Sequence, residues 1–207
     1  MAAYPSVSAP YGFKPINRID GMPYAGAIQQ IPVTSGQAIY YGDTVKVVAG
    51  GTISRSGATT SGTIVGVFVG VQYVNAQGQT VQAQYCPSSG VTSPIAYVVV
   101  DPSAAYKVAV TTTGSTTTVT GANSTIVGCN VAQTAWAAGS NTTGDSISAV
   151  VLPANGAGDT TTLPFRVIAV VPDTAYVNGS GVTIYPEVIV KINDPQYTAL
   201  TGTTYTA

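Results

Sequence analysis

The chain contains no histidine, and Asp, Glu, Lys and Arg together make up only 7% of its 207 residues. Histidine is the commonest general acid/base near neutral pH and the commonest protein ligand for transition metals. A single glutamate and three leucines also leave few strong helix formers. These absences argue against an enzyme and against a helical fold. We therefore expect no catalytic residues, no cofactor and no metal site.

Charge of either sign is scarce and is spread along the chain. Seven basic and eight acidic residues give a formal net charge of -1, and the basic residues are scattered from Lys14 to Lys191. Nucleic-acid binding needs clustered Lys and Arg. The longest apolar stretch, Thr63 to Val74, is shorter than the ~20 residues that span a bilayer, and the first residues lack the pattern of a secretory signal. We expect neither nucleic acid nor membrane as a partner.

Cysteine is nearly absent, with only Cys86 and Cys129. Two cysteines do not make a disulfide framework in a chain of this length, and their spacing fits no zinc site. The sequence predicts two unpaired, partly buried structural thiols. A single bridge between them is the alternative.

What the chain does contain is abundant Val, Ile, Thr and Tyr, which favour strands. Short strand patterns recur between turn residues, as is typical of all-β sandwiches and barrels. The run Val98 to Val100 indicates a strand buried on both faces. The best helical candidate is Ser124 to Trp136, although Gly128 interrupts it. We expect an all-β fold, a compact antiparallel barrel or sandwich, with strands near residues 27–33, 44–48, 53, 64–74, 80–85, 95–100, 106–110, 147–152, 165–171 and 188–192.

Three parts are expected along the chain. Prolines and aromatic residues alternate over residues 1–26, which predicts an extended N-terminal arm that lies on its own body or on a neighbour; a loose tail is the alternative. Residues 27–195 form the β-rich body, one domain that could divide into two β subdomains. Residues 196–207 form a C-terminal tail. Because no strand pattern of the body includes the arm, we expect the body to fold without it.

Residues that could support chemistry are few. Asp173 and Glu187 flank two strands that could pair, and a carboxylate pair can hydrolyse glycosides. The favoured interpretation is a turn residue and a charge on a strand. Most other aspartates lie beside Gly, Pro, Ser or Thr, which indicates turns rather than metal ligands; they are Asp20, Asp43, Asp101, Asp145, Asp159 and Asp194.

Several segments together resemble a known protein family. They are PYGFKPI (Pro10 to Ile16), YYGDTVKV (Tyr40 to Val47), GVFVGVQYV (Gly66 to Val74), AYVVVDPSAAYKVAV (Ala96 to Val110), LPFRVIAVVPDT (Leu163 to Thr174) and PEVIVKIN (Pro186 to Asn193). The chain is similar to small virion proteins of tailed bacteriophages, notably those of aquatic bacteria, which are thought to be head decoration (cement) proteins.

This resemblance implies a structural virion protein that binds the exterior of the phage capsid and staples neighbouring shell subunits. The implied partners are the major capsid protein and further copies of the chain, with a homotrimer favoured over a dimer. The implied location is the capsid exterior, after assembly in the host bacterial cytoplasm. Capsid contact by an extended N-terminal segment would fall on Ala9 through Arg18, with these candidate contact residues: Tyr11, Phe13, Lys14, Ile16 and Arg18.

Two alternatives stay open. A tail or fibre component of the same virion would be equally rich in β-structure and poor in charge. A carbohydrate-binding β module would need exposed aromatic side chains, for which the candidates are Tyr73, Tyr85, Tyr97 and Trp136.

Overall fold

The computed structural model describes residues 9–24, 27–57, 62–111, 126–134, 139–151, 162–171, 174 and 185–198. In these ranges the chain forms strands and turns and no α-helix, which confirms the expected all-β fold. The strands in chain order are β1 (Lys14–Arg18), β2 (Ile28–Pro32), β3 (Thr44–Val48), β4 (Thr52–Arg55), β5 (Gly66–Asn75), β6 (Thr80–Ala83), β7 (Val91–Val99), β8 (Ala104–Thr111), β9 (Asn130–Gln133), β10 (Val150–Val151), β11 (Phe165–Val170) and β12 (Glu187–Ile192).

Five strands close into a small barrel, in the order β8-β10-β9-β11-β12, with β12 returning to β8. All of its strand pairs are antiparallel except β8 with β10. The strand β1 also pairs with β8, antiparallel, with Lys14 opposite Lys107. Inward-facing residues fill the barrel, and the largest fully buried ones are Tyr106, Phe13 and Phe165.

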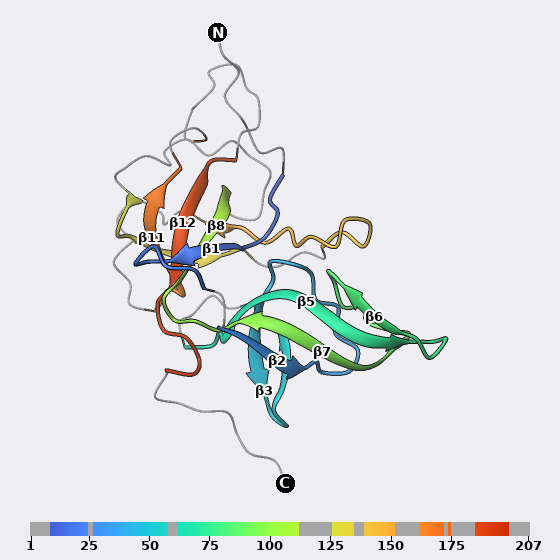
Figure 1. Cartoon of the computed structure of the whole chain (residues 1–207). Coiled ribbons are helices and arrows are strands. Elements are labelled where there is room, and N and C mark those ends of the chain that lie inside the picture. The colour runs from blue at the N-terminus through green and yellow to red at the C-terminus, as the bar shows by residue number, and fades with distance from the viewer. Residues whose placement is uncertain are drawn as a thin grey trace.

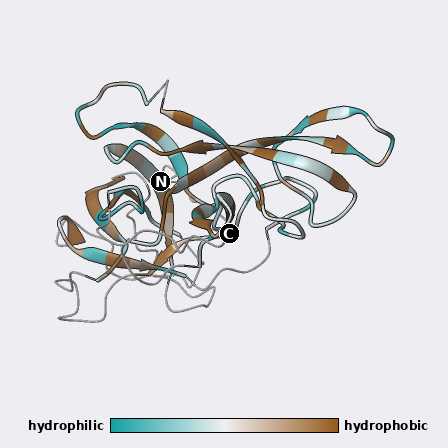
Figure 2. Cartoon of the chain, turned by 90° about the horizontal axis from the view of Figure 1, so that it is seen from below, coloured by the Kyte–Doolittle hydropathy of each residue, from teal (hydrophilic) through white to brown (hydrophobic). Residues whose placement is uncertain are grey.

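The second sheet has the order β2-β7-β5-β3-β4, and β6 pairs with β5 beside this path. Its inward face forms a second core that includes Ile39, Ile53, Phe68 and Val98. The two sheets lie one above the other in Figure 1. Figure 2 shows hydrophobic stretches, in brown, on the strands of both.

Strands β5 and β7 lie between the two cores. Val67 and Val99 belong to the barrel core, whereas their neighbours Phe68 and Val98 belong to the second core. Successive residues of a strand point to opposite faces, so each of these strands is buried on both sides where the sheets meet. This confirms the expectation for the run Val98 to Val100, of which the first two residues are fully buried.

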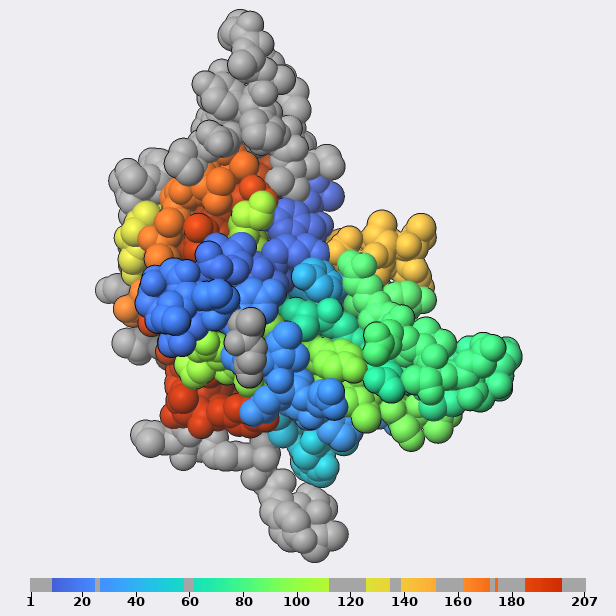
Figure 3. Space-filling view, in the orientation of Figure 1, coloured from blue at the N-terminus to red at the C-terminus, as the bar shows by residue number. Residues whose placement is uncertain are grey.

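The N-terminal residues of the described part are extended and lie on the chain's own body, which is one of the two placements expected for the arm. The amide of Phe13 donates to the carbonyl of Gly42 (2.9 Å), and the amide of Gly12 donates to the carbonyl of Ser148 (3.1 Å). In the space-filling view the blue N-terminal segment lies against the orange and red strands of the barrel (Figure 3). Residues 11–18 are therefore packed against the barrel, and Phe13 contributes to its core.

Two glycines allow the N-terminal segment to pass close to the backbone at Gly42. Gly12 and Gly42 both have a left-handed backbone, with φ of 81° and 86°. A Cβ on Gly12 would lie 2.7 Å from the Cβ of Ser146 and 2.8 Å from the carbonyl oxygen of Gly42. Only glycine meets both the backbone angle and the close approach at this crossing.

Two elements differ from the sequence-based expectations, the candidate helix and the strand β1. The candidate helix at Ser124 to Trp136 contains the strand β9 in its described part, because Val131 faces the barrel core and Asn130 pairs with Arg166. The strand β1 was not expected at all. Gln196, the first residue of the expected C-terminal tail, contacts β3: its side-chain amide accepts from the Val47 N–H (2.7 Å) and donates to the Val47 carbonyl (2.9 Å).

Candidate functional site

The five candidate contact residues have different surroundings. Phe13 is fully buried and stacks on Phe165, with ring centroids 4.6 Å apart. A side chain in the barrel core cannot anchor another protein, so Phe13 is wrong as a contact residue. Ile16 is 37% exposed on β1. The other three, Tyr11, Lys14 and Arg18, bind acidic residues of this same chain.

Tyr11 is held by a carboxylate and a cation of the barrel. Its hydroxyl donates to Glu187 at the start of β12, and the Nζ atom of Lys107 on β8 lies 3.1 Å from the same carboxylate oxygen. The Lys107 Nζ atom is also 5.7 Å from the centre of the Tyr11 ring. Burial, the hydrogen bond to Glu187 and the charge of Glu187 raise the pKa of Tyr11 above its usual range. Tyr11 therefore stays a hydrogen-bond donor at neutral pH and attaches the N-terminal segment to the barrel.

Lys14 joins the N-terminal segment to two other loops. Its Nζ atom lies 2.6 Å from Asp145 and 4.0 Å from the centre of the Tyr41 ring. Gln84 also donates to the same Asp145 oxygen, at 3.2 Å. Burial, with the neighbouring Tyr24 and Asp145, raises the pKa of Tyr41. The arrangement fixes three distant segments together and leaves the Lys14 charge half-buried.

A second ion pair lies inside the protein. Asp43 accepts from Arg55 at 2.7 Å, from the Ser146 hydroxyl at 2.6 Å and from the backbone amide of Tyr40 at 2.9 Å. Burial raises the pKa of Asp43, while the Arg55 charge and these hydrogen bonds act in the opposite direction. The donors come from three places in the chain: Arg55 at the end of β4, the serines of segment 146–148, and the backbone just before Asp43. These interactions hold the three segments together, and the side chains of Asp43 and Arg55 are almost fully buried.

Exposed apolar side chains gather where β1 ends. Ile16, Ile19 and Met22 are 37%, 48% and 58% exposed, and we call these three residues the apolar tip. Backbone bonds fix its shape, from Arg18 to Met22 (2.8 Å) and from Ile19 to Ser103 (2.8 Å). The Arg18 guanidinium lies beside it, 3.2 Å from Asp101. Sequence reasoning found Ile16 and missed the other two, although the Asp20-Gly21 turn signal pointed to an exposed loop.

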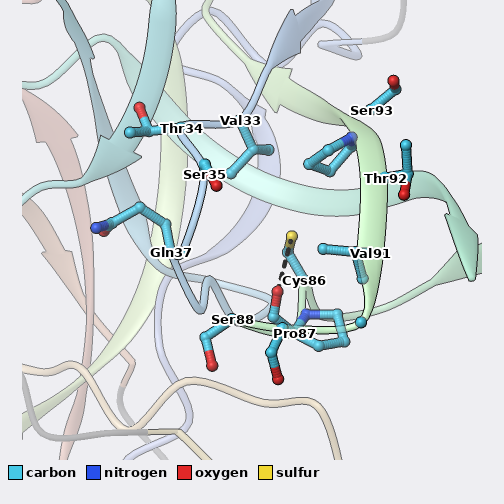
Figure 4. Close-up of a pocket in the computed structure, with 14 residues that line it drawn as sticks. Val33, Thr34, Ser35, Gln37, Cys86, Pro87, Ser88, Val91, Thr92 and Ser93 are labelled. Atoms are coloured by element: carbon cyan, nitrogen blue, oxygen red, sulfur yellow. Dashed lines mark hydrogen bonds between the residues drawn. The ribbon is translucent and has the colours of Figure 1, made fainter. Parts of the chain in front are cut away.

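A pocket of about 430 Å³ lies between the segment after β2 and the segment before β7. Its lining is uncharged and rich in hydroxyl groups, as Figure 4 shows for Thr34, Ser88 and Thr92. The thiol of Cys86 lies within this lining, and its sulfur is 3.6 Å from the carbonyl oxygen of Pro87. Burial raises the pKa of Cys86 to about 11, so the thiol is protonated at neutral pH and is a poor nucleophile.

The aspartates in the described ranges show the expected turn chemistry at several positions. Asp20 accepts from the amide of Met22 (3.1 Å), and Asp101 accepts from that of Ser103 (2.7 Å). Over the same ranges no three Cys, Asp or Glu residues gather in a way that could hold a metal ion. Asp173, the suggested partner of Glu187, and Asp159 lie outside the described residues.

The aromatic residues considered for sugar binding are dispersed. Tyr73 packs against the second core, and Tyr85 stacks on Tyr40 at 5.7 Å. Tyr97 borders a shallow groove on β5 and β6 and donates to Gln72 at 3.1 Å. Trp136 lies outside the described residues. Both cysteines are outside any disulfide, as expected.

The described part of the chain holds no helix that is long and apolar enough to cross a membrane. Comparison with protein-family models, with curated proteins and with solved structures found no match to this chain.

Proposed function

We propose that this protein is a structural component of a phage virion that binds the exterior of the capsid and joins neighbouring shell subunits. The observation that supports it best is the apolar tip, a group of three exposed apolar side chains on the edge strand β1 and the turn that follows it. Apolar side chains in a shape fixed by backbone bonds lose little entropy on docking. The charged pair of Arg18 and Asp101 lies at the margin of the tip, where polar groups set orientation more than affinity.

The segments that resemble decoration proteins support the proposal in a second way. They form β1, β3, β5, β7, β8, β11 and β12, which build both cores and the wall between them. The resemblance therefore concerns the scaffold, and the contact surface is left to exposed residues. The contact residues proposed here are accordingly Ile16, Ile19 and Met22, with Arg18 beside them. The partner is the major capsid protein, and the location is the outer face of the head after assembly in the bacterial cytoplasm.

Binding to heads tests the proposal. Expanded heads assembled from the major capsid protein of the same phage genome are mixed with purified chain and pelleted. The variant with Ile19→Lys and Met22→Lys should bind at least about tenfold more weakly, since contact-centre residues contribute more than 1 kcal/mol each. Val127→Lys is the matched control, because Val127 is an equally exposed apolar residue (45%) in the segment before β9.

The outcomes separate the alternatives. Failure of the wild-type chain to bind heads, with its density found on the tail of the virion by electron microscopy, would favour a tail or fibre component. Equal binding by the tip variant and the wild type would place the capsid contact on another surface.

A further inference from the structure

The part of the second sheet that β2, β5, β6 and β7 form has no charged side chains. No Asp, Glu, Lys or Arg occurs between Asp20 and Asp43, or between Arg55 and Asp101. These two stretches build β2, β5, β6 and β7. Depletion of charge, rather than hydrophobicity as such, distinguishes the centre of a protein–protein interface from the rest of a surface.

The strand register shows which side chains form the outer face. Ile31 lies opposite Ala96, and both point into the second core. The alternating residues therefore point outward, with Gln30 opposite Tyr97 and Pro32 opposite Ile95. The next strand continues the face, since Gln72 of β5 lies opposite Ile95. The exposed apolar residues of this face are Ile28 (43%) and Ile95 (38%).

Two residues of β2 direct their backbone N–H and C=O groups away from the sheet. The carbonyl of Ala27 accepts from Val100, and the amide of Val33 donates to Pro94. Because hydrogen bonding alternates along an antiparallel ladder, odd-numbered residues of β2 bond to β7, and Ile28 and Gln30 direct their N–H and C=O groups outward. In the described sheet β2 is the first strand. At the C-terminal end of β2 its outward side meets β4, where Val33 bridges Ile53 and the amide of Thr34 donates to the carbonyl of Ile53 (2.9 Å). The outward groups of Ile28 and Gln30 lie nearer the other end of the strand.

We propose that β2 pairs antiparallel with β2 of a second copy of this chain, across a two-fold axis at Gln29. In that register Ile28 faces Gln30 of the partner subunit, and each outward N–H of one copy meets an outward C=O of the other. The contact is self-complementary, as a two-fold interface requires. No charge lies on β2, so two copies approach without like-charge repulsion, whereas natural edge strands usually carry Lys to prevent this pairing.

The pairing goes beyond the proposed function, and it favours a dimer over the homotrimer that the resemblance implies. It uses the edge of the second sheet, while capsid binding was assigned to the apolar tip on the barrel. The two contacts are therefore separable by substitution. Ile28, which is 43% exposed in the single chain, lies in the proposed contact.

Sedimentation over a range of concentrations tests the dimer. The wild type should associate as a dimer, and Ile28→Lys should weaken association roughly tenfold or more, because it places one positive charge on each side of the two-fold axis, diagonal to each other across the paired strands. Gln30→Pro removes an outward N–H but no bond to β7, so it should weaken the dimer and keep the fold. Gln82→Lys is the matched control on the same face, away from β2. Thermal unfolding of each variant checks that the fold is retained.

A cross-link gives a positive test. Gln29 meets its own copy at the axis as a non-hydrogen-bonded pair, with a Cα separation of about 4.5 Å that suits a disulfide. Gln29→Cys should therefore form a covalent dimer on oxidation, and Gln82→Cys should not. A monomeric or trimeric wild type, or a dimer that withstands both Ile28→Lys and Gln30→Pro, overturns the pairing. Variants that keep the dimer but lose head binding would assign this edge to the shell protein and also overturn it. Dimerisation without any binding to heads would contradict the capsid function alone.

Discussion

Replacing Phe13 by alanine should destabilise the whole barrel. Phe13 precedes β1, has no exposed surface and stacks on Phe165 from β11. Truncating a buried phenylalanine costs about 3–5 kcal/mol, from lost burial and from the cavity that remains. For a domain of this size each 1 kcal/mol shifts Tm by roughly 2–4 °C. A fall in Tm of roughly 6–20 °C is therefore expected.

Thermal unfolding followed by far-ultraviolet circular dichroism measures the fall in Tm, and urea unfolding measures the loss of free energy. Ile16→Ala is the control, because Ile16 lies three residues further along and is partly exposed; it should change the free energy of unfolding by about 0.5 kcal/mol or less. The reasoning is refuted when Phe13→Ala unfolds at the same urea concentration as the wild type. That result would mean that the N-terminal segment leaves the barrel without cost.

The same reasoning reverses the sequence-based expectation for truncation. Deleting the residues through Arg18 removes Phe13 from the core, Tyr11 from Glu187 and Lys14 from Asp145. The truncated chain should be less stable than Phe13→Ala. A loss of head binding on truncation would therefore report unfolding as well as lost contacts, and point substitutions at the apolar tip are the sharper experiment.

Three further predictions concern the interior. Arg55→Met should lower the free energy of unfolding by about 3–5 kcal/mol, because it leaves the Asp43 carboxyl buried without its cation. Chemical denaturation measures this loss, and a change under about 1 kcal/mol would contradict the prediction. Gly42→Ala should lower the free energy of unfolding by more than about 1 kcal/mol, since the φ of Gly42 is positive and a Cβ would lie 2.9 Å from the amide nitrogen of Phe13. Gly50→Ala is the control, because its φ is also positive but no atom lies near the added Cβ, so it shows the effect of backbone strain without the steric clash. The free energy of unfolding should be constant from pH 5 to 8 and fall above pH 9. The reason is that the Cys86 thiol keeps its proton to about pH 11 in the folded chain, whereas in the unfolded chain it loses the proton near its ordinary pKa. Cys86→Ala should remove the decline between pH 9 and 10, and an unchanged decline in that variant would assign it to another group.

The sequence by itself determined the class of fold and much of the strand content. Alternation of Val, Ile, Thr and Tyr between turn residues is a local signal, and it located β3, β5 and β12 within a few residues. Burial of the run at Val98 followed from the absence of polar residues in it. Unpaired cysteines followed from their number and spacing. Each of these features depends on residues that are close together in the chain, which is why the sequence alone could predict it.

Only the tertiary structure decided where the first strand goes and which side chains meet. β1 contains Pro15 and has no clean alternation, so the sequence predicts an extended arm there. The segment forms a strand because it pairs with β8 and because Phe13, just before it, packs into the barrel core. Asp43 meets Ser146, and Lys14 meets Asp145, across more than a hundred residues of chain. Such contacts depend on strand order and register, which are set by packing the two cores together, and no local pattern in the sequence encodes them.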